Sequence, residues 1–254
     1  MKALITGGTT GLGKELAIEL SFKGYDLILV SRHENDLEEI KSRCKPNTNI
    51  EFKSLDLTKE DDCYRLVKET ESINIDLFIN NAGFDDIGKL TDTSLEKEVS
   101  MVKLNDIASL ILIKSFLIRF INQGKGRVLS VCSAASFGVA GYMNVYYSTK
   151  AFVYSLSHGY HRELKDMKSN VTISMLCPGP IKTNFEKNAN AKFIYSVADP
   201  KYIAKYTIKR FLKGKLEIVP SFKMKAAHFF SHFVPKRFIS KALNKQAEIE
   251  DEEA

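Results

Sequence analysis

The stretch that decides the fold is Thr6-Gly7-Gly8-Thr9-Thr10-Gly11-Leu12-Gly13, near the start of the chain. From Gly7 onward its glycines have the spacing GxxxGxG. A short apolar run at residues 2–6 precedes it, and a helical pattern at residues 12–22 follows it. Glycine permits positive φ and lets a backbone approach a pyrophosphate closely, and the start of a helix offers free N–H groups to phosphates. We therefore interpret residues 6–13 as a dinucleotide-binding turn between a strand and a helix.

Apolar runs of strand length alternate with helical patterns along the chain. The run at residues 26–30 is continuously apolar after its first residue, as expected of a strand that is buried on both faces. Alternating strands and helices with right-handed crossovers predict an α/β fold with a doubly wound parallel sheet, Rossmann-like, and a ligand crevice at the carboxyl ends of the strands. The predicted strands are residues 2–6, 26–30, 50–55, 76–79, 127–132 and 171–176.

Length and composition favour one catalytic domain with a short addition. With 254 residues, 44% of them hydrophobic, the chain can bury one large core, which we assign to residues 1–220, and residues 221–254 form a helical, amphipathic C-terminal extension. The apolar stretch 107–118 contains Lys114 and is too short for a membrane span. The N-terminus runs directly into a strand, and the four cysteines are scattered. We expect a cytoplasmic protein with reduced cysteines.

The net charge of +6 is unevenly distributed. Residues 201–245 are rich in Lys and Arg with Glu217 as their only acid, and an acidic tail follows at residues 248–253. A basic protein invites a nucleic-acid interpretation, but no known docking motif accompanies the charge. We predict no nucleic-acid partner, because a phosphate-rich cofactor accounts for part of the balance.

The residues after the second predicted strand indicate which dinucleotide binds. An acid at that place accepts hydrogen bonds from the adenosine ribose and repels a 2′-phosphate, whereas an Arg does the opposite. The chain has Ser31 and Arg32 there and no acid at the turn. Both side chains can bind a 2′-phosphate through charge-assisted bonds. We predict that NADP(H) is preferred over NAD(H).

Tyr146 and Lys150 are the candidates for proton transfer. A free phenol has a pKa of about 10, and a nearby ammonium lowers it by favouring the phenolate. Residues four apart share a helix face, so Lys150 lies on the same face as Tyr146. The alternative candidate, Tyr147, has Ala151 four residues later and therefore lacks a cation. Tyr146 would protonate the oxygen of a carbonyl during reduction or take the proton of an alcohol during oxidation. Ser133 would polarise the same oxygen, and Lys150 would also hold the nicotinamide ribose.

Over roughly residues 2–220 the chain resembles a short-chain dehydrogenase/reductase of the compact branch. The resemblance rests on residues 6–13, Asn80-Asn81-Ala82-Gly83, Ser133, Tyr146 with Lys150, and residues 178–183. It implies that Asn105 completes a Ser-Tyr-Lys tetrad by holding a water that relays protons to Lys150. It also implies that Asp56 binds the adenine amino group, that Asn81 and Gly83 lie near the adenosine ribose, and that Ile181 and Thr183 lie at the nicotinamide carboxamide. The expected cofactor contacts are Gly7, Thr9, Thr10, Gly11, Leu12, Gly13, Ser31, Arg32, Asp56, Leu57, Asn81, Ala82, Gly83, Tyr146, Lys150, Pro178, Gly179, Ile181 and Thr183.

The resemblance also concerns assembly and the substrate. It implies a homodimer or homotetramer, paired through the helices that hold Asn105 and Tyr146, and a lid over the substrate at about residues 184–198. We expect a small-molecule carbonyl or alcohol with a hydrophobic body, such as a 3-oxoacyl group, a steroid or an aromatic ketone. The candidate wall residues are mostly apolar: Phe84, Ala134, Ala135, Phe137, Val139, Tyr142 and Phe185.

Two interpretations of residues 222–243 stay open, because phenylalanines alternate there with lysines and arginines around Pro235. A basic amphipathic segment can lie on an acidic membrane. Its apolar face can instead pack on the enzyme's own body or on another subunit and close the substrate cleft, which we favour. His228 and His232 are four apart, but no third ligand accompanies them, so we predict no metal site.

A non-enzymatic function on the same fold is the alternative, namely a dinucleotide-binding regulator or a scaffold at a membrane surface. Fold alone does not exclude it. The joint presence of Ser133, Tyr146 and Lys150 favours the enzyme, because a protein that only binds a dinucleotide has no need of all three.

Overall fold

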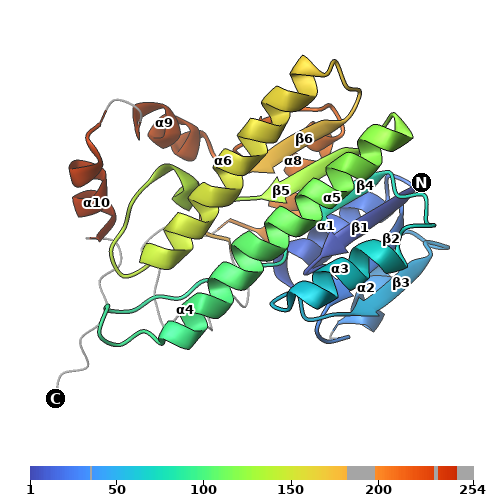
Figure 1. The fold of residues 1–254 in the computed structure, drawn as a ribbon, viewed down its shortest axis with the longest axis horizontal. Coiled ribbons are helices and arrows are strands. Elements are labelled where there is room, and N and C mark those ends of the chain that lie inside the picture. The colour runs from blue at the N-terminus through green and yellow to red at the C-terminus, as the bar shows by residue number, and fades with distance from the viewer. Residues whose placement is uncertain (35, 182–197, 232–233, 245–254) are drawn as a thin grey trace.

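Seven parallel strands form the central sheet (Figure 1). The computed structural model describes residues 1–34, 36–181, 198–231 and 234–244. The strand order is β3-β2-β1-β4-β5-β6-β7, which confirms the predicted doubly wound α/β fold. The strands are β1 (Lys2–Thr6), β2 (Asp26–Ser31), β3 (Ile50–Ser54), β4 (Leu77–Asn80), β5 (Arg127–Val131), β6 (Thr172–Leu176) and β7 (Glu217–Ile218).

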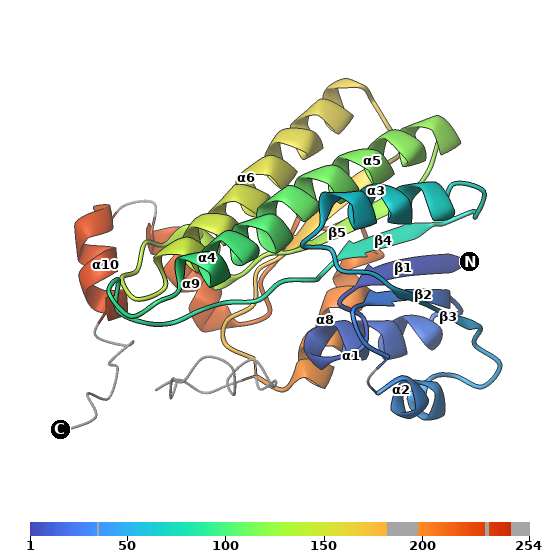
Figure 2. The ribbon, with the colours of Figure 1, turned by 60° about the horizontal axis from the view of Figure 1, so that its bottom comes forward.

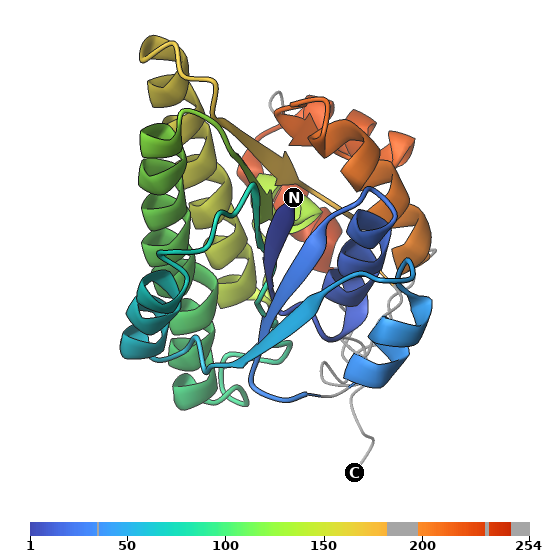
Figure 3. The same ribbon diagram turned by 90° about the vertical axis from the view of Figure 1, so that its right-hand side faces the viewer.

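Helices cover both faces of the sheet (Figure 3). One face carries α1 (Gly11–Ser21), α2 (Leu37–Arg43) and α8 (Pro200–Phe211), with α1 against α8. The other face carries α3 (Glu60–Glu69), α5 (Ala108–Gln123) and α6 (Asn144–Asp166). A further helix, α4 (Leu95–Val102), runs into α5 through the π-helical turn η1 (Lys103–Ile107).

Two hydrophobic cores lie between the sheet and its helix layers. Alternate strand residues point to opposite faces, so Leu4 enters the core under α3, α5 and α6, whereas Ile5 enters the core under α1, α2 and α8. In the first core, Phe78 of β4 stacks on Phe116 of α5 with ring centres 4.3 Å apart. Each fully buried aromatic or aliphatic side chain contributes about 1.5–3 kcal/mol, and burial on both faces explains the continuous apolar pattern of the inner strands.

The site is positioned by the change of direction in the strand order. The chain builds β1, β2 and β3 outward, then returns past β1 to start β4 on its other side. All pairs are parallel, so the residues after Thr6, Ser31, Asn80, Val131 and Leu176 lie along one edge of the sheet. Ligands of such sheets bind at this carboxyl edge, beside the change of direction.

The C-terminal part contains one strand that was not predicted and two short helices within the expected helical extension. Strand β7 was not predicted, because two residues are too few to show a periodic pattern. After it come α9 (Phe222–Ser231) and α10 (Lys236–Asn244), which lie beyond α6 at the margin farthest from β3 (Figures 1 and 2). Among the described residues, none of the helices is both long enough and apolar enough to cross a membrane.

Candidate active site

The glycine turn between β1 and α1 is closely packed at Gly7 and Gly13. Gly7 and Gly11 have φ of +62° and +52°, in the left-handed region. A Cβ on Gly13 would stand 2.0 Å from the Gly7 carbonyl oxygen. Thr9 is buried, and Thr10 is exposed and does not cap α1 through its side chain. The residues present therefore fit the diphosphate of a dinucleotide, with the close backbone and the first N–H groups of α1 facing it.

The end of β4 holds this turn in place. The Asn81 side-chain amide donates to the carbonyl oxygens of Thr6 and Gly7, at 3.0 Å each. The backbone N–H groups of Asn81 and Ala82 donate to the Thr6 hydroxyl at 3.0 and 3.1 Å. The Asn81 side-chain amide thus donates within the protein, and it fixes the shape of the glycine turn.

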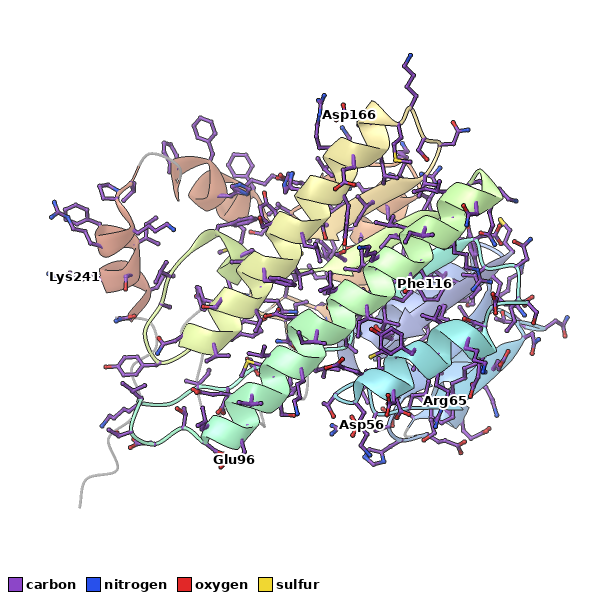
Figure 4. The ribbon with its side chains drawn as sticks, in the orientation of Figure 1. Asp56, Arg65, Glu96, Phe116, Asp166 and Lys241 are labelled. Atoms are coloured by element: carbon purple, nitrogen blue, oxygen red, sulfur yellow. The ribbon has the colours of Figure 1, made fainter. Side chains whose placement is uncertain are left out.

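The adenine end lies after β2 and β3. Asp56, just ahead of α3 (Figure 4), accepts hydrogen bonds from the hydroxyl and N–H of Thr58 at 2.8 and 3.2 Å. Burial alone would raise the pKa of Asp56, but these hydrogen bonds and the nearby Arg32 guanidinium lower it below its ordinary value. The Ser54 hydroxyl donates to the Arg32 carbonyl at 3.2 Å and fixes the backbone there. The Arg32 side chain is exposed beside the partly exposed Ser31.

Leu12 and Leu57 differ from the other expected contacts. Both side chains are buried, Leu12 in the core under α1 and Leu57 in the core under α3 and α5. Only their backbone atoms can face a cofactor. For Leu12 this suits its place in the first turn of α1, where backbone N–H groups are free to face a phosphate.

Ser133, Tyr146 and Lys150 come together at the ends of β5 and α6. Ser133 follows β5, and its hydroxyl accepts a hydrogen bond from Ala135 N–H at 3.1 Å and lies within hydrogen-bonding reach of the Tyr146 phenol. Lys150 Nζ lies 5.8 Å from the centre of the Tyr146 ring and donates to the Val131 carbonyl at 3.2 Å. The three groups needed to polarise and protonate one oxygen atom thus share one place.

The pKa of Tyr146 is shifted in the direction opposite to the one expected from the sequence. Burial raises the pKa of Tyr146 well above its ordinary value, Asp85 raises it further, and the Ser133 hydrogen bond only partly opposes this. Burial also lowers the pKa of Lys150. The expectation that Lys150 lowers the Tyr146 pKa was therefore wrong for this arrangement, because desolvation acts on both groups and weakens the cation. The Tyr146 phenol is therefore protonated at neutral pH, which is the form that a proton donor needs, although the raised pKa also makes it a weaker acid than a free phenol.

Asn105 positions its neighbours with its whole side chain. It lies in the π turn η1, and Oδ1 accepts from Phe84 N–H at 3.2 Å while Nδ2 donates to Phe84 carbonyl oxygen at 2.9 Å and to Thr149 Oγ1 at 3.0 Å. Thr149 in turn donates to the Tyr146 carbonyl at 2.8 Å. The amide therefore ties the segment after β4 to the helix turn that carries Tyr146. Sequence reasoning missed Thr149. Its place between Tyr146 and Lys150 was the only signal in the sequence that it lies at the site.

Gly83 links the cofactor side to the proton-transfer side. A Cβ on Gly83 would stand 2.8 Å from Asn105 Oδ1 and 3.5 Å from Lys150 Nζ. Gly83 is two residues from Asn81, which holds the glycine turn. The segment 81–83 thus brings the predicted cofactor contacts and the predicted tetrad to one edge of the sheet.

The last group of expected contacts follows β6. The Pro178 carbonyl accepts from Ala134 N–H at 2.8 Å, which places Pro178 and Gly179 beside Ser133. Ile181 pairs with Ala198 in an isolated bridge. Thr183 lies outside the described residues, as do Phe185 and the expected lid up to residue 197.

Comparison with known proteins agrees with this geometry. Residues 1–193 match the profile of the family described as short chain dehydrogenase. The chain belongs to the short-chain dehydrogenase family. A 3-oxoacyl-[acyl-carrier-protein] reductase of Buchnera aphidicola is 32% identical over 82% of the chain and 82% of that protein. The human dehydrogenase/reductase SDR family member 7 is 30% identical over 75% of the chain, which spans only 58% of that longer protein.

The fold agrees with a solved structure over the whole chain. A short-chain dehydrogenase from Sphingobium yanoikuyae in complex with NADPH superposes with a TM-score of 0.82 at 24% identity, covering 100% of this chain and 97% of that one. This chain is therefore an oxidoreductase of the short-chain dehydrogenase family, with the family's nucleotide-binding fold.

Asp85 is a group of this short-chain dehydrogenase that sequence reasoning missed. It follows the segment that Asn105 holds and is only 4% exposed. Burial raises its pKa to about 6, its own backbone N–H and the nearby Lys150 oppose the rise, and Asp86 adds to it. The signal in the sequence was an acid two residues after Asn80-Asn81-Ala82-Gly83, the segment that follows β4 at the carboxyl edge of the sheet. Asp85 is thus a buried carboxylate beside the tetrad.

We expect Asp85→Asn to raise the stability of the short-chain dehydrogenase at neutral pH. The folded-state pKa of about 6 exceeds the ordinary 3.8, so ionisation costs about 3 kcal/mol above pH 6, and that cost disappears as the pH falls through 6 towards 4. The melting temperature of the variant should exceed that of the parent at neutral pH, and the two should converge at about pH 4. Asp86→Asn is the matched control, because Asp86 pairs with Lys97 at 2.6 Å and gains nothing from neutralisation. Equal melting temperatures at neutral pH would contradict the expectation.

Proposed function

We propose that this chain is an NADP(H)-dependent oxidoreductase that interconverts a carbonyl and a secondary alcohol on a hydrophobic substrate. The observation that supports it best is the convergence of Ser133, Tyr146 and Lys150 beside Gly83, next to the segment that shapes the glycine turn. A dinucleotide-binding regulator would not need a phenol, an amine and a hydroxyl at the same place.

The chain's own residues supply the proton and the orientation. When bound, the nicotinamide supplies or accepts the hydride. In reduction, Tyr146 gives its phenolic proton to the carbonyl oxygen, and the Ser133 hydroxyl polarises that oxygen. Lys150 is held by the Val131 carbonyl on one side and lies near the Tyr146 ring on the other, so it can hold a ribose hydroxyl and return a proton towards the phenol. Asn105 holds the segment after β4 against the helix turn that carries Tyr146.

The candidate wall residues and the relatives both support a hydrophobic substrate. Ala135 is buried, and Phe84 and Tyr142 are partly buried. Tyr142 also lines a small hollow together with Asp86, Leu90 and Met101. The mostly apolar side chains of Phe84, Ala135 and Tyr142 support a substrate with a hydrophobic body. The similarity to a 3-oxoacyl reductase supports a 3-oxoacyl chain, and a steroid or aromatic ketone has the same requirement for an apolar wall.

A screen of substrates tests the proposal. The purified chain is mixed with NADPH and a set of 3-oxoacyl thioesters, steroids and aromatic ketones, and the absorbance of the reduced nicotinamide is followed. We expect oxidation of NADPH with at least one hydrophobic ketone, and reduction of NADP⁺ with the corresponding alcohol. Tight NADPH binding without turnover of any substrate in either direction would support a regulator instead.

Arg32 is expected to set the cofactor preference. Arg32→Ala should weaken NADPH binding by about tenfold to a hundredfold, because a hydrogen bond to a charged group contributes about 1.5–3 kcal/mol, and it should leave NADH binding unchanged. Fluorescence titration with both cofactors measures this. Arg162→Ala removes an exposed arginine at the far end of α6 and serves as the control. If the parent chain prefers NADH, or if Arg32→Ala weakens both cofactors equally, the assignment of NADP(H) does not hold.

We also propose a cytoplasmic homodimer or homotetramer that pairs through α5 and α6. Ile118 on α5 and Phe152 on α6 are exposed apolar side chains on these helices, which supports pairing there. Size-exclusion chromatography of the parent and of Ile118→Glu tests it, and an elution volume that does not change on substitution would contradict this pairing.

A further inference from the structure

The helices α9 and α10 are attached to the body of the enzyme through one face. The His228 ring lies 3.6 Å from the Phe137 ring, measured between centres, and Met224 lies against Gly179. Further along, Leu243 lies against Gly138, and Asn244 Oδ1 accepts a hydrogen bond from Gly141 N–H at 2.6 Å. This inner face therefore rests on the segment that begins at Ser133 and on Gly179 after β6.

The opposite face of the two helices exposes large apolar side chains. Phe222 is 84% exposed, Phe230 is 60% exposed and Phe238 is 53% exposed. Figure 4 shows side chains of α9 and α10 extending away from the rest of the molecule. We call this the outer face, and it consists of Phe222, Phe229, Phe230, Val234 and Phe238. Single exposed apolar residues are common, but five within one short segment indicate a contact surface.

The charge around the outer face has one sign. Residues 222–244 include five Lys and Arg and no Asp or Glu. Exposed cations accompany both helices: Lys225 on α9, and Lys236, Arg237 and Lys241 on α10, with Lys241 at the margin in Figure 4. The Arg237 guanidinium lies 4.7 Å from the centre of the Phe238 ring. A partner that covers the rings must therefore also accept several positive charges.

Three occupants can be compared on charge and apolarity. A second copy of the outer face would bring the same cations together, and like charges facing each other disfavour an isologous contact. The acidic tail at residues 248–253 could neutralise cations, but its only large apolar residue is Ile249, so it could not cover five apolar side chains. An anionic lipid surface offers phosphates to the cations and acyl chains to the rings.

We propose that the outer face of α9 and α10 docks the enzyme on an anionic lipid bilayer. The phenylalanine rings enter the boundary between headgroups and acyl chains, and the lysines and arginines contact the phosphates around them. The helices lie on the membrane and do not cross it. Because their inner face rests on the segment after Ser133, docking would place the substrate side of the enzyme near the bilayer. The proposal concerns binding to lipid and does not depend on the catalytic assignment.

Vesicle co-sedimentation of the full-length chain tests this proposal. One set of vesicles contains phosphatidylcholine alone, and the other also contains phosphatidylglycerol. We expect the chain to sediment with the anionic vesicles only, and less so as the salt concentration rises. The variant with Phe222→Ser, Phe230→Ser and Phe238→Ser should lose at least about tenfold in vesicle affinity, because it no longer buries the rings. The variant with Lys236→Ala and Lys241→Ala should lose about fivefold for each cation removed.

Matched controls separate docking from general effects. Phe22→Ser, Tyr64→Ser and Met167→Ser together remove three comparably exposed apolar side chains outside α9 and α10 and should leave vesicle binding unchanged. Lys209→Ala with Lys213→Ala removes two exposed cations from the end of α8 and the turn after it, with the same expectation. Circular dichroism and NADPH binding check that each variant is folded. Failure to sediment with anionic vesicles, equal binding to both vesicle types, or equal loss in the control variants would overturn the proposal. Self-association that the triple phenylalanine variant abolishes would also overturn it, in favour of a contact between copies.

Discussion

Tyr146→Phe is expected to lower turnover by about a thousandfold while NADPH binding stays unchanged. The substitution removes one oxygen atom and leaves the ring, which lies near Lys150 and the Tyr147 ring. Without the phenol the chain loses the group that we propose as the proton donor to the carbonyl oxygen. Because burial keeps the Tyr146 pKa above its ordinary value, the phenol is protonated at neutral pH, and the oxidation of alcohols, which needs the phenolate, should become faster as the pH rises towards that pKa. Initial rates in both directions across the pH range measure both effects.

Tyr147→Phe is the matched control for this prediction. Tyr147 is the next residue on the same helix and loses the same atom, but the residue four places further on is Ala151 and not a lysine. Its turnover should remain close to that of the parent. Full activity of the Tyr146 variant, or loss of activity in the Tyr147 variant with Tyr146 intact, would show that the proton comes from elsewhere.

The sequence could predict those parts of the site that depend on local spacing. The glycine turn at residues 6–13 is visible because no side chain fits where Gly13 meets Gly7, and four-residue spacing is enough to pair Tyr146 with Lys150. The inner strands are continuous apolar runs, since both faces of the sheet are covered. In each case the physical constraint acts between residues that are close along the chain.

The remaining features depend on contacts between distant segments. The Asn105 amide binds Phe84 and Thr149, which no local pattern shows. The burial of Asp85 depends on the same packing, and the raised Tyr146 pKa depends on the total burial at the site and not on the neighbouring lysine. Residues 222–243 left two interpretations open, because periodicity shows that a helix has an apolar side but not how many sides are covered. In the structure one side packs on the body and another is exposed.

Gly13→Ala is expected to destabilise the fold and to abolish NADPH binding. The added Cβ would stand 2.0 Å from the Gly7 carbonyl oxygen and 2.5 Å from Asn81 Nδ2. Neither atom can move alone, because that amide holds Gly7 at 3.0 Å and Gly7 N–H donates to the Val30 carbonyl at 2.7 Å. The turn must open, at a cost of about 3 kcal/mol or more. The melting temperature should fall by about 10 °C, and the surface that fits a pyrophosphate is lost.

Gly159→Ala makes the same change where the opposite result is expected. Gly159 lies in α6, is exposed, and has open space where the Cβ would be placed. Alanine should stabilise this helix by about 0.5–1 kcal/mol, because glycine loses more conformational freedom on folding. Thermal unfolding and NADPH titration of both variants compare the two sites. A Gly13 variant that melts with the parent and binds NADPH as tightly would mean that the turn tolerates a side chain, and the close packing of β1 against α1 would then not be what shapes the cofactor site.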